Sequence, residues 1–265
     1  MSTYLDVIRY RDLLGNLFRR DLQAKYRGSA LGVLWTIANP VMLMGVYLLV
    51  FGVVWKSPFA NGGHYALFLL TGLALWTFFA TAVQSSTRSM LDNANLIRKT
   101  RFPRQLVPLS VVLAHLVSFA AMLVLLLVVN FIALPRARAT ELLAIPLAIL
   151  FVGIVFGIAL AAASLNVLFR DIEFIVAALL LPLFFLTPIL YPLTGSSLDK
   201  HRVLVDVIHW ANPLSPAIEA VRAPLFAGTL PRWTDTLYLV AACVLALGLG
   251  AFVFRSVDDQ IAIEV

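Results

Sequence analysis

Side chains that could do chemistry are scarce in this sequence. His115 is the only histidine or charged residue inside six long apolar runs, and a lone histidine on an apolar helix is more often a hydrogen-bonded packing residue than a ligand. His64, His201 and His209 lie outside these runs, and no His/Cys/Asp spacing typical of a metal site surrounds them. No lysine follows a glycine, so the phosphate-binding sequence G-x-x-x-x-G-K-[ST] is absent. We therefore expect no metal, no cofactor and no ATP hydrolysis in this chain itself.

The densest charge lies in residues 85–104, which carry five basic residues and one acid between two apolar runs. Asp92 or Asn93 can cap a short helix there, and Pro103 would end it before the next run. Apolar residues set among the charges favour a docking surface, although a plain topology-fixing loop would explain the charges equally well. The candidate contact residues are Asn93, Asn95, Leu96, Ile97, Arg98, Lys99, Arg101, Phe102 and Arg104.

The composition indicates a membrane protein with several spans. Hydrophobic residues make up 61% of the chain and charged residues 13%, which leaves too little polar surface for a soluble domain. The net charge of +6 comes from basic residues at the ends of apolar runs, so we expect no nucleic-acid partner. Cys243 is the only cysteine and lies inside an apolar run, which excludes an intrachain disulfide.

Six stretches without Asp, Glu, Lys or Arg are long enough to cross a bilayer as helices. With the N-terminus in the cytoplasm, thirteen Lys and Arg residues fall inside and seven outside, so both ends are expected to be cytoplasmic. No cleavable signal peptide is visible. The predicted domains are an interface helix at 1–29 and one transmembrane domain at 30–265. The predicted spans lie near 31–55, 65–86, 105–134, 142–169, 174–198 and 236–254.

The first 29 residues alternate apolar and basic positions at roughly helical spacing, which predicts an amphipathic helix in the membrane interface. A basic leader that only fixes topology is the alternative. The cations suit a phosphate headgroup, although attraction to anionic lipids would explain them equally well and Asp21 could pair locally. The candidate headgroup residues are Arg19, Arg20, Lys25 and Arg27.

Aromatic residues are frequent in the first and fifth predicted spans. Most such residues in membrane proteins pack or anchor at the interface, but rings that line a pathway would offer flat faces to neutral sugars. The candidate channel aromatics are Trp35, Tyr47, Phe51, Phe184 and Phe185.

Residues 203–228 are too polar and broken to span the membrane, yet too apolar for a free loop. Asn212-Pro213 separates two helical pieces, and Ser215 can cap the second with Pro216 at its first position. Glu219 can pair with Arg222 one turn later. A re-entrant hairpin on the outer side is predicted, with a small extracellular cap as the alternative.

Four groups of residues together resemble the membrane subunits of type-2 ABC exporters of lipid-linked polysaccharides and teichoic acids. The resemblance covers nearly the whole chain, and its groups occur in the family's order. They are Arg20-Asp21 with Tyr26, Leu31-Gly32, Trp35 and Pro40; Asn95-Leu-Ile-Arg-Lys with Phe102-Pro103-Arg104; Asn166 with Arg170-Asp171; and Asn212-Pro213-Leu214 with Glu219 and Arg222.

This resemblance implies an all-α membrane protein with six transmembrane helices per subunit and an N-terminal interface helix. It implies a homodimeric permease in the bacterial inner membrane, a cytoplasmic coupling helix at 93–104, and external gate helices before the last span, where Asn212, Pro213, Glu219 and Arg222 lie. ATP and Mg would bind two copies of a separate ATPase subunit, while this chain would contact membrane lipids and a lipid-linked glycan.

Two other functional classes remain open from the sequence. A secondary transporter would need an ion or proton site in the spans, which the lack of charge there disfavours. A membrane-embedded transferase acting on lipid-linked sugars would need carboxylates or histidines near a membrane face, and only Asp199, Asp206 and Glu219 are candidates. The exported polymer could be an O-antigen, a teichoic acid or another envelope glycan.

Overall fold

The computed structural model describes residues 9–29, 32, 34–54, 65–100, 102–135, 138–193 and 202–264. All regular structure in these ranges is helical, so the predicted all-α class is confirmed. Its long elements are α2 (Arg11–Tyr26), α3 (Leu34–Tyr47), α4 (Tyr65–Asp92), α6 (Leu106–Ala133), α7 (Ala144–Leu168), α8 (Asp171–Leu186) and α11 (Trp233–Glu264). The shorter ones are η1 (Leu48–Val54), α5 (Ala94–Lys99), η3 (Glu141–Leu143), α9 (Arg202–Trp210), α10 (Leu214–Arg222) and η5 (Ala223–Ala227).

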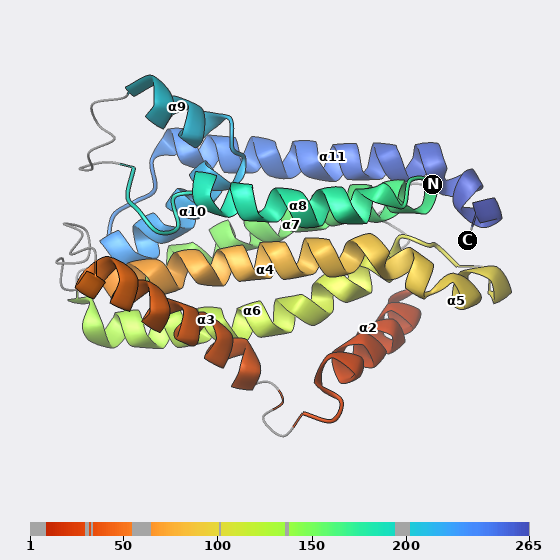
Figure 1. The fold of residues 1–265 in the computed structure, drawn as a ribbon, viewed down its shortest axis with the longest axis horizontal. Coiled ribbons are helices and arrows are strands. Elements are labelled where there is room, and N and C mark those ends of the chain that lie inside the picture. The colour runs from red at the N-terminus through yellow and green to blue at the C-terminus, as the bar shows by residue number, and fades with distance from the viewer. Residues whose placement is uncertain are drawn as a thin grey trace.

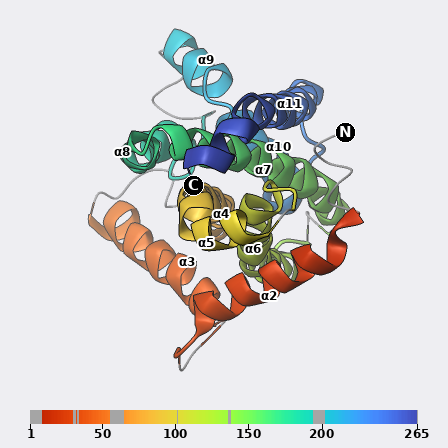
Figure 2. The same cartoon turned by 90° about the vertical axis from the view of Figure 1, so that its right-hand side faces the viewer.

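Five helices, α4, α6, α7, α8 and α11, run along the long axis of the molecule (Figure 1). Seen from the end that carries α5, α4 lies at the centre, with α6, α7 and α8 around it and α2 across the bottom (Figure 2). Accordingly, most of α4 between Tyr65 and Met90 is buried. The hydrophobic core is therefore built around the second apolar run of the sequence.

Four helical segments are long and apolar enough to cross a membrane: Tyr65–Asp92, Leu106–Ala133, Glu141–Leu168 and Trp233–Asp258. The first predicted span is instead divided between α3 and the π-helical η1, and the apolar stretch Ile37–Val50 runs across both. The fifth, expected at 174–198, is helical only from Asp171 to Leu186, and 194–198 lie outside the described residues.

Helix α8 ends early because of Pro188. A proline disfavours helical geometry in the residue before it, and Thr187 accordingly has φ −90° and ψ 137°. Sixteen residues give a helix of about 24 Å, shorter than the hydrocarbon core of a bilayer. Other prolines interrupt less, because Pro108 and Pro146 stand in the first turns of α6 and α7, where the missing N–H has no helical acceptor.

The α7 and α11 helices make the closest contact in the bundle, and glycines permit it. A Cβ atom added to Gly157 would lie 2.3 Å from the backbone carbonyl of Ala246, and one on Gly250 would lie 2.5 Å from the carbonyl oxygen of Gly157. Small residues let the backbones of membrane helices approach in this way. This pair therefore depends on two residues that have no side chain.

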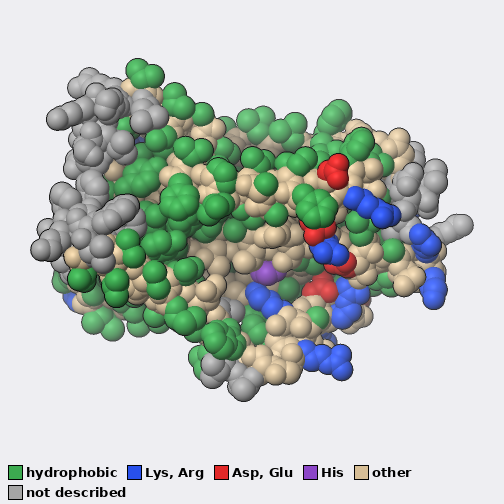
Figure 3. All heavy atoms as spheres, in the orientation of Figure 1, with side chains coloured by type: hydrophobic (Ala, Val, Ile, Leu, Met, Phe, Trp, Pro, Cys, Tyr) green, Lys and Arg blue, Asp and Glu red, His purple; other side chains and the backbone are tan. Residues whose placement is uncertain are grey.

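Charged side chains gather toward one end of the visible face, over α2 and α5, while the rest of the described part of that face is largely hydrophobic or uncharged (Figure 3). The exposed positions of α6 and α11 continue this apolar surface, with Val128 53% exposed, Leu245 63% and Leu249 61%. An extended apolar surface of this kind is suited to contact with membrane lipid. The charged end marks where the bundle meets water.

Candidate functional site

Helix α2 is held against α6 by polar contacts at helical spacing. The Ser110 hydroxyl donates a hydrogen bond to Asp21 Oδ2 at 2.6 Å. Two turns further along α6, Ser118 Oγ accepts from Lys25 Nζ at 2.7 Å and lies 2.8 Å from the Tyr26 hydroxyl. A helix is thus present within the predicted segment 1–29. Its side toward the bundle combines the buried Leu17 with the half-buried Asp21 and Tyr26, while most of its charged side chains are exposed.

His115 joins this cluster. Its Nδ1 atom lies 3.2 Å from Lys25 Nζ, so the histidine is one part of a polar pair that spans two helices. Although much of the Lys25 side chain is exposed, its ammonium end is desolvated, and this lowers the pKa of Lys25 from 10.5 to about 8. A lysine with this pKa can gain or lose a proton near neutral pH.

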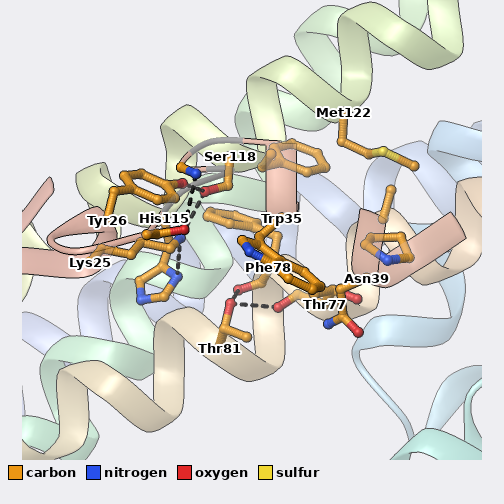
Figure 4. A pocket seen from close by; sticks show the side chains of 15 residues that line it. Lys25, Tyr26, Trp35, Asn39, Thr77, Phe78, Thr81, His115, Ser118 and Met122 are labelled. Atoms are coloured by element: carbon orange, nitrogen blue, oxygen red, sulfur yellow. Dashed lines mark hydrogen bonds between the residues drawn. The ribbon is translucent and has the colours of Figure 1, made fainter. Parts of the chain in front are cut away.

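The cluster opens into a cavity of about 320 Å³ between α2, α3, α4 and α6. Lys25 and Tyr26 reach it from one side, and Trp35 and Asn39 of α3 lie across from them (Figure 4). Trp35 was predicted as a channel residue and Lys25 as a headgroup residue, so the fold brings members of two predicted sets into one cavity.

The remaining predicted headgroup residues lie on the surface of α2 or just beyond its end. Arg20 pairs with Asp21 at 2.8 Å, as its position in the sequence suggested. Arg19 and Arg27 are exposed. The Lys25 cavity, defined by Lys25, Tyr26, Trp35, His115 and Ser118, is therefore reached directly by only one of the four predicted cations.

The aromatic residues of the fifth predicted span differ in burial and contacts. Phe184 is buried and lies between Tyr47, at a centroid distance of 6.0 Å, and Trp76, at 5.4 Å. Phe185 packs edge to face on Phe184 but is 56% exposed. The side chain of Phe51 lies outside the described residues.

These rings border a groove of about 390 Å³ between α3, α4 and α8. Tyr47, Trp76 and Phe184 line one part of it, and Thr77, Thr81 and Gln84 of α4 line another. We call it the aromatic groove. It combines flat apolar faces with uncharged polar groups.

Helix α5 forms where the sequence predicted a short helix, but its apolar side faces the bundle. Ile97 is 7% exposed and Phe102 packs partly against the core. Leu96 is half-buried, while Asn95, Arg98 and Lys99 are exposed, and Arg101 lies outside the described residues. The surface left for a partner is therefore mainly polar and basic.

Two further residues of this segment have partners within the chain. Arg104 donates from Nη1 to Asp258 Oδ1 at 3.0 Å and to the backbone carbonyl of Asp258, which ties the segment to α11. Asn93 stands at the N-cap position of α5, but its amide donates to the Ser89 carbonyl at 2.8 Å. The prediction that Asn93 caps the helix with its side chain is wrong, because that side chain is engaged with the end of α4.

The ABC-2 type transporter profile matches residues 13–226, from α2 to the end of η5, apart from the final residue of that element. The chain belongs to this family. It is 34% identical over 259 residues to the O-antigen export system permease protein RfbA of Myxococcus xanthus, which covers 97% of this chain and 96% of that relative. It is 33% identical over 243 residues to a protein of the same name from Klebsiella pneumoniae, covering 91% of each chain. The polysialic acid transport protein KpsM of Escherichia coli is 23% identical over 248 residues, covering 92% of each.

The end of the bundle opposite α5 contains the predicted pair of Glu219 and Arg222, in α10 (Figure 1). The two side chains meet at 2.9 Å, and Arg222 also donates to the Pro188 carbonyl at 2.8 Å. Arg222 is 2% exposed, and its guanidinium lies 3.8 Å from the ring centroid of Phe68. This arginine therefore joins α10 to the end of α8 and to α4.

The start of α10 differs from the prediction. The helix begins at Leu214, so Ser215 lies inside it and makes no cap. Instead, Asn212 Oδ1 accepts the backbone N–H of Leu214 at 3.0 Å, and its amide donates to Thr187 Oγ1 at 2.8 Å. Asparagine favours such a turn because its short side chain can bond the backbone two residues on.

Sequence reasoning missed two polar groupings. His209 and Asp235 form a buried contact at 3.0 Å between α9 and α11, but 26 positions separate them in the chain. Ser118 stands one helical turn after His115, and a polar pair at that spacing in an apolar run was the available signal. Among the described residues, no group of three or more His, Cys, Asp or Glu could hold a metal ion.

Proposed function

We propose that the chain is the permease subunit of an ABC exporter that moves a lipid-linked polysaccharide, such as an O-antigen or teichoic acid, across the bacterial inner membrane. The observation that carries the proposal is similarity along nearly the whole chain to permeases named for O-antigen export. ATP would be hydrolysed with Mg by a separate subunit, because the sequence has no phosphate-binding loop. We propose a homodimer with two ATPase subunits, six spans per chain and cytoplasmic termini.

The Lys25 cavity is proposed to receive the phosphate part of the lipid-linked substrate. An ammonium beside hydroxyl groups is suited to phosphate oxygens, and Lys25 Nζ and the Tyr26 hydroxyl lie 2.7 and 2.8 Å from the Ser118 hydroxyl. Arg19, Arg20 and Arg27 would attract the headgroup to this end of the bundle without contacting it in the cavity. Charge reversal at Arg20 should then reduce substrate-stimulated ATPase activity more than basal activity.

The contact with the ATPase is proposed to be made by α5. This helix protrudes at the charged end of the bundle (Figure 1), and its exposed residues Asn95, Arg98 and Lys99 would orient the partner. Leu96 would supply the apolar contact, while buried Ile97 and the Arg104–Asp258 pair would transmit movement to the transmembrane helices.

At the opposite end, α9 and α10 are proposed as an external gate, and the aromatic groove as part of the pathway. Asn212, Pro213, Glu219 and Arg222 would fix α10 against α8, so opening would require these contacts to break. Cysteines placed in α9 and α10 should then become more accessible to an impermeant thiol reagent during ATP-driven transport.

Complementation tests the proposal. The chain and its ATPase are expressed in a strain that lacks its own O-antigen permease, and surface glycan is measured with ATPase co-purification. Wild type should restore glycan, and Arg98→Glu with Lys99→Glu should abolish both export and co-purification while the protein still inserts. Arg11→Glu is the matched control, because Arg11 is exposed at the start of α2. Absence of glycan with a folded, ATPase-bound wild-type chain would contradict the proposed function.

A further inference from the structure

Helix α4 has one open face, and that face is polar. From Thr77 onward, the exposed or half-exposed positions follow each other at helical spacing, and only Ala80 and Leu91 among them are apolar. The remaining positions of this stretch are buried in the bundle. The polar members are Thr77, Thr81, Gln84, Ser85, Arg88 and Asp92.

The open faces of other spanning helices are different. Val124 and Val128 of α6 are 59% and 53% exposed, and Leu245 and Leu249 of α11 are 63% and 61% exposed. Polar side chains in the hydrocarbon region are costly unless they face the bundle interior or a water-filled space. A polar open face on the central helix therefore indicates a different environment from that of α6 and α11.

Three hollows adjoin this face. Thr77, Thr81 and Gln84 line the aromatic groove, and Arg88 lines a cavity of about 530 Å³ with Arg170 and Glu173 at the charged end. Thr77 and Thr81 also line the Lys25 cavity. These two threonines are thus the place where the Lys25 cavity and the aromatic groove meet.

The chemistry of the face is close to neutral. The one cation, Arg88, is paired with Glu173 at 3.1 Å. The Thr81 hydroxyl donates to the Thr77 carbonyl at 2.7 Å, which leaves its oxygen able to accept, and the Gln84 amide can donate and accept at once. Hydrogen bonds between such uncharged groups and sugar hydroxyls have ordinary strength. A sugar chain could therefore break one such bond and form the next as it moves.

We propose that the α4 polar face, defined as Thr77, Thr81, Gln84 and Arg88, is the track along which a polyhydroxylated chain passes, opposite the rings of the aromatic groove. This inference rests on the proposed export function and names the groups that contact the glycan. At Thr77 and Thr81 the chain would leave the compartment that holds its phosphate and enter the groove.

Cysteine labelling tests the track in the complete complex. In a Cys243→Ala background, Thr81→Cys and Gln84→Cys are compared with Leu245→Cys and Leu249→Cys, which are exposed on α11 at similar distances from the charged end. The probe is a water-soluble methanethiosulfonate, applied to membranes with the ATPase present. We expect the α4 cysteines to react at least about tenfold faster, because a thiol in lipid does not ionise.

The occupant is tested by repeating the labelling in membranes from cells that make the glycan and from cells that lack its first glycosyltransferase. Slower labelling of Thr81→Cys and Gln84→Cys in the glycan-making cells is expected. Equal rates in the two membranes would overturn the glycan assignment, and rates no higher than the α11 controls would show lipid contact. Spontaneous disulfides between two Thr81→Cys chains would show that a second copy covers the face and would also overturn it.

Uncharged variants give an independent measurement. Thr81→Val and Gln84→Leu should reduce surface glycan roughly three- to tenfold at unchanged protein level, as expected for one lost hydrogen bond, while Leu245→Ala should not. If the wild-type and Cys243→Ala chains both fail to restore glycan, the proposed function fails whatever the labelling shows. If they restore it and the two polar variants export normally, the track alone is wrong.

Discussion

The α7–α11 pair and the α2–α3 segment show two ways of attaching a helix to this bundle. The first pair meets backbone to backbone, with glycines at 157 and 250 where any side chain would clash. Helix α3 makes no such approach, and Gly45 within it has open space where a Cβ would be. Helix α2 has one buried side chain, Leu17, and is joined to α6 by hydrogen bonds that involve Asp21, Lys25 and Tyr26.

The difference separates a fixed scaffold from a segment that can move. Dispersion contacts along two closely packed backbones are lost together, so such a pair separates only on unfolding. A few hydrogen bonds at a membrane interface can be exchanged for water at small net cost. We therefore expect substrate-linked motion at the Lys25 cavity and little between α7 and α11.

The largest effect is expected at the glycine contact. Gly157→Ala places a Cβ 2.3 Å from the Ala246 carbonyl and should destabilise the protein by roughly 1–3 kcal/mol or more. Gly45→Ala is the matched control, and it should leave the melting temperature unchanged or raise it, since alanine is the better helix former. Thermal unfolding in one detergent measures both. Equal melting temperatures for the two variants would contradict the idea that α7 and α11 depend on a close backbone contact that α3 lacks.

The second largest effect is expected on the local stability of α2. Ser118→Ala removes the hydroxyl that hydrogen-bonds both Lys25 and Tyr26, and it should loosen α2 by about 1 kcal/mol without changing global unfolding. Hydrogen exchange should quicken in α2 and stay constant in α7 and α11. Ser256→Ala on α11 serves as the control, because its hydroxyl bonds only the Phe252 carbonyl of its own helix among the contacts described. Faster exchange in α7 after Ser118→Ala would contradict a separately attached α2.

A third effect depends on pH and on Lys25. Because desolvation lowers its pKa to about 8, Lys25 loses its charge as the pH rises through that value. Stimulation of ATPase activity by a lipid-linked phosphate substrate should therefore fall between about pH 7 and pH 9. Lys25→Arg should keep the stimulation at the higher pH, since arginine stays charged. A pH profile that is the same in both chains would exclude Lys25 as the titrating group.

The same pKa shift has a defined sign for stability. Between about pH 8 and pH 10.5, folded Lys25 binds fewer protons than the unfolded lysine, so its contribution to stability rises with pH over that window. The loss of stimulation at high pH is therefore not expected to come from unfolding. The melting temperature measured across the same range checks this point.

The smallest effect is expected at the start of α2. Arg11 and Asp12 are 3.9 Å apart with side chains 83% and 97% exposed, and such surface pairs contribute little because water and salt screen them. Arg11→Gln should leave the melting temperature, export and exchange in α2 within experimental error. A clear loss of export would show that α2 acts through its surface charge as well as through the Lys25 cavity.

The sequence by itself determined the helical class, the apolar segments and the family. Charge-free runs near 65–86, 105–134, 142–169 and 236–254 correspond to the four helices that are long and apolar enough to span. The short helix before Pro103 and the pairing of Glu219 with Arg222 also followed from sequence, because proline and i, i+3 effects act over one or two turns.

Only the tertiary structure decided which sides of these helices meet. The spacing of apolar residues does not say whether Ile97 is exposed or buried. Packing against the bundle buries it. Lys25 and His115 are 90 residues apart, and Thr81 reaches their cavity from a third helix. Helical periodicity places residues on a common side of one helix, but the direction that this side faces depends on crossing angles set by contacts between distant segments. For this reason the polar side of α4 becomes evident only in the folded bundle.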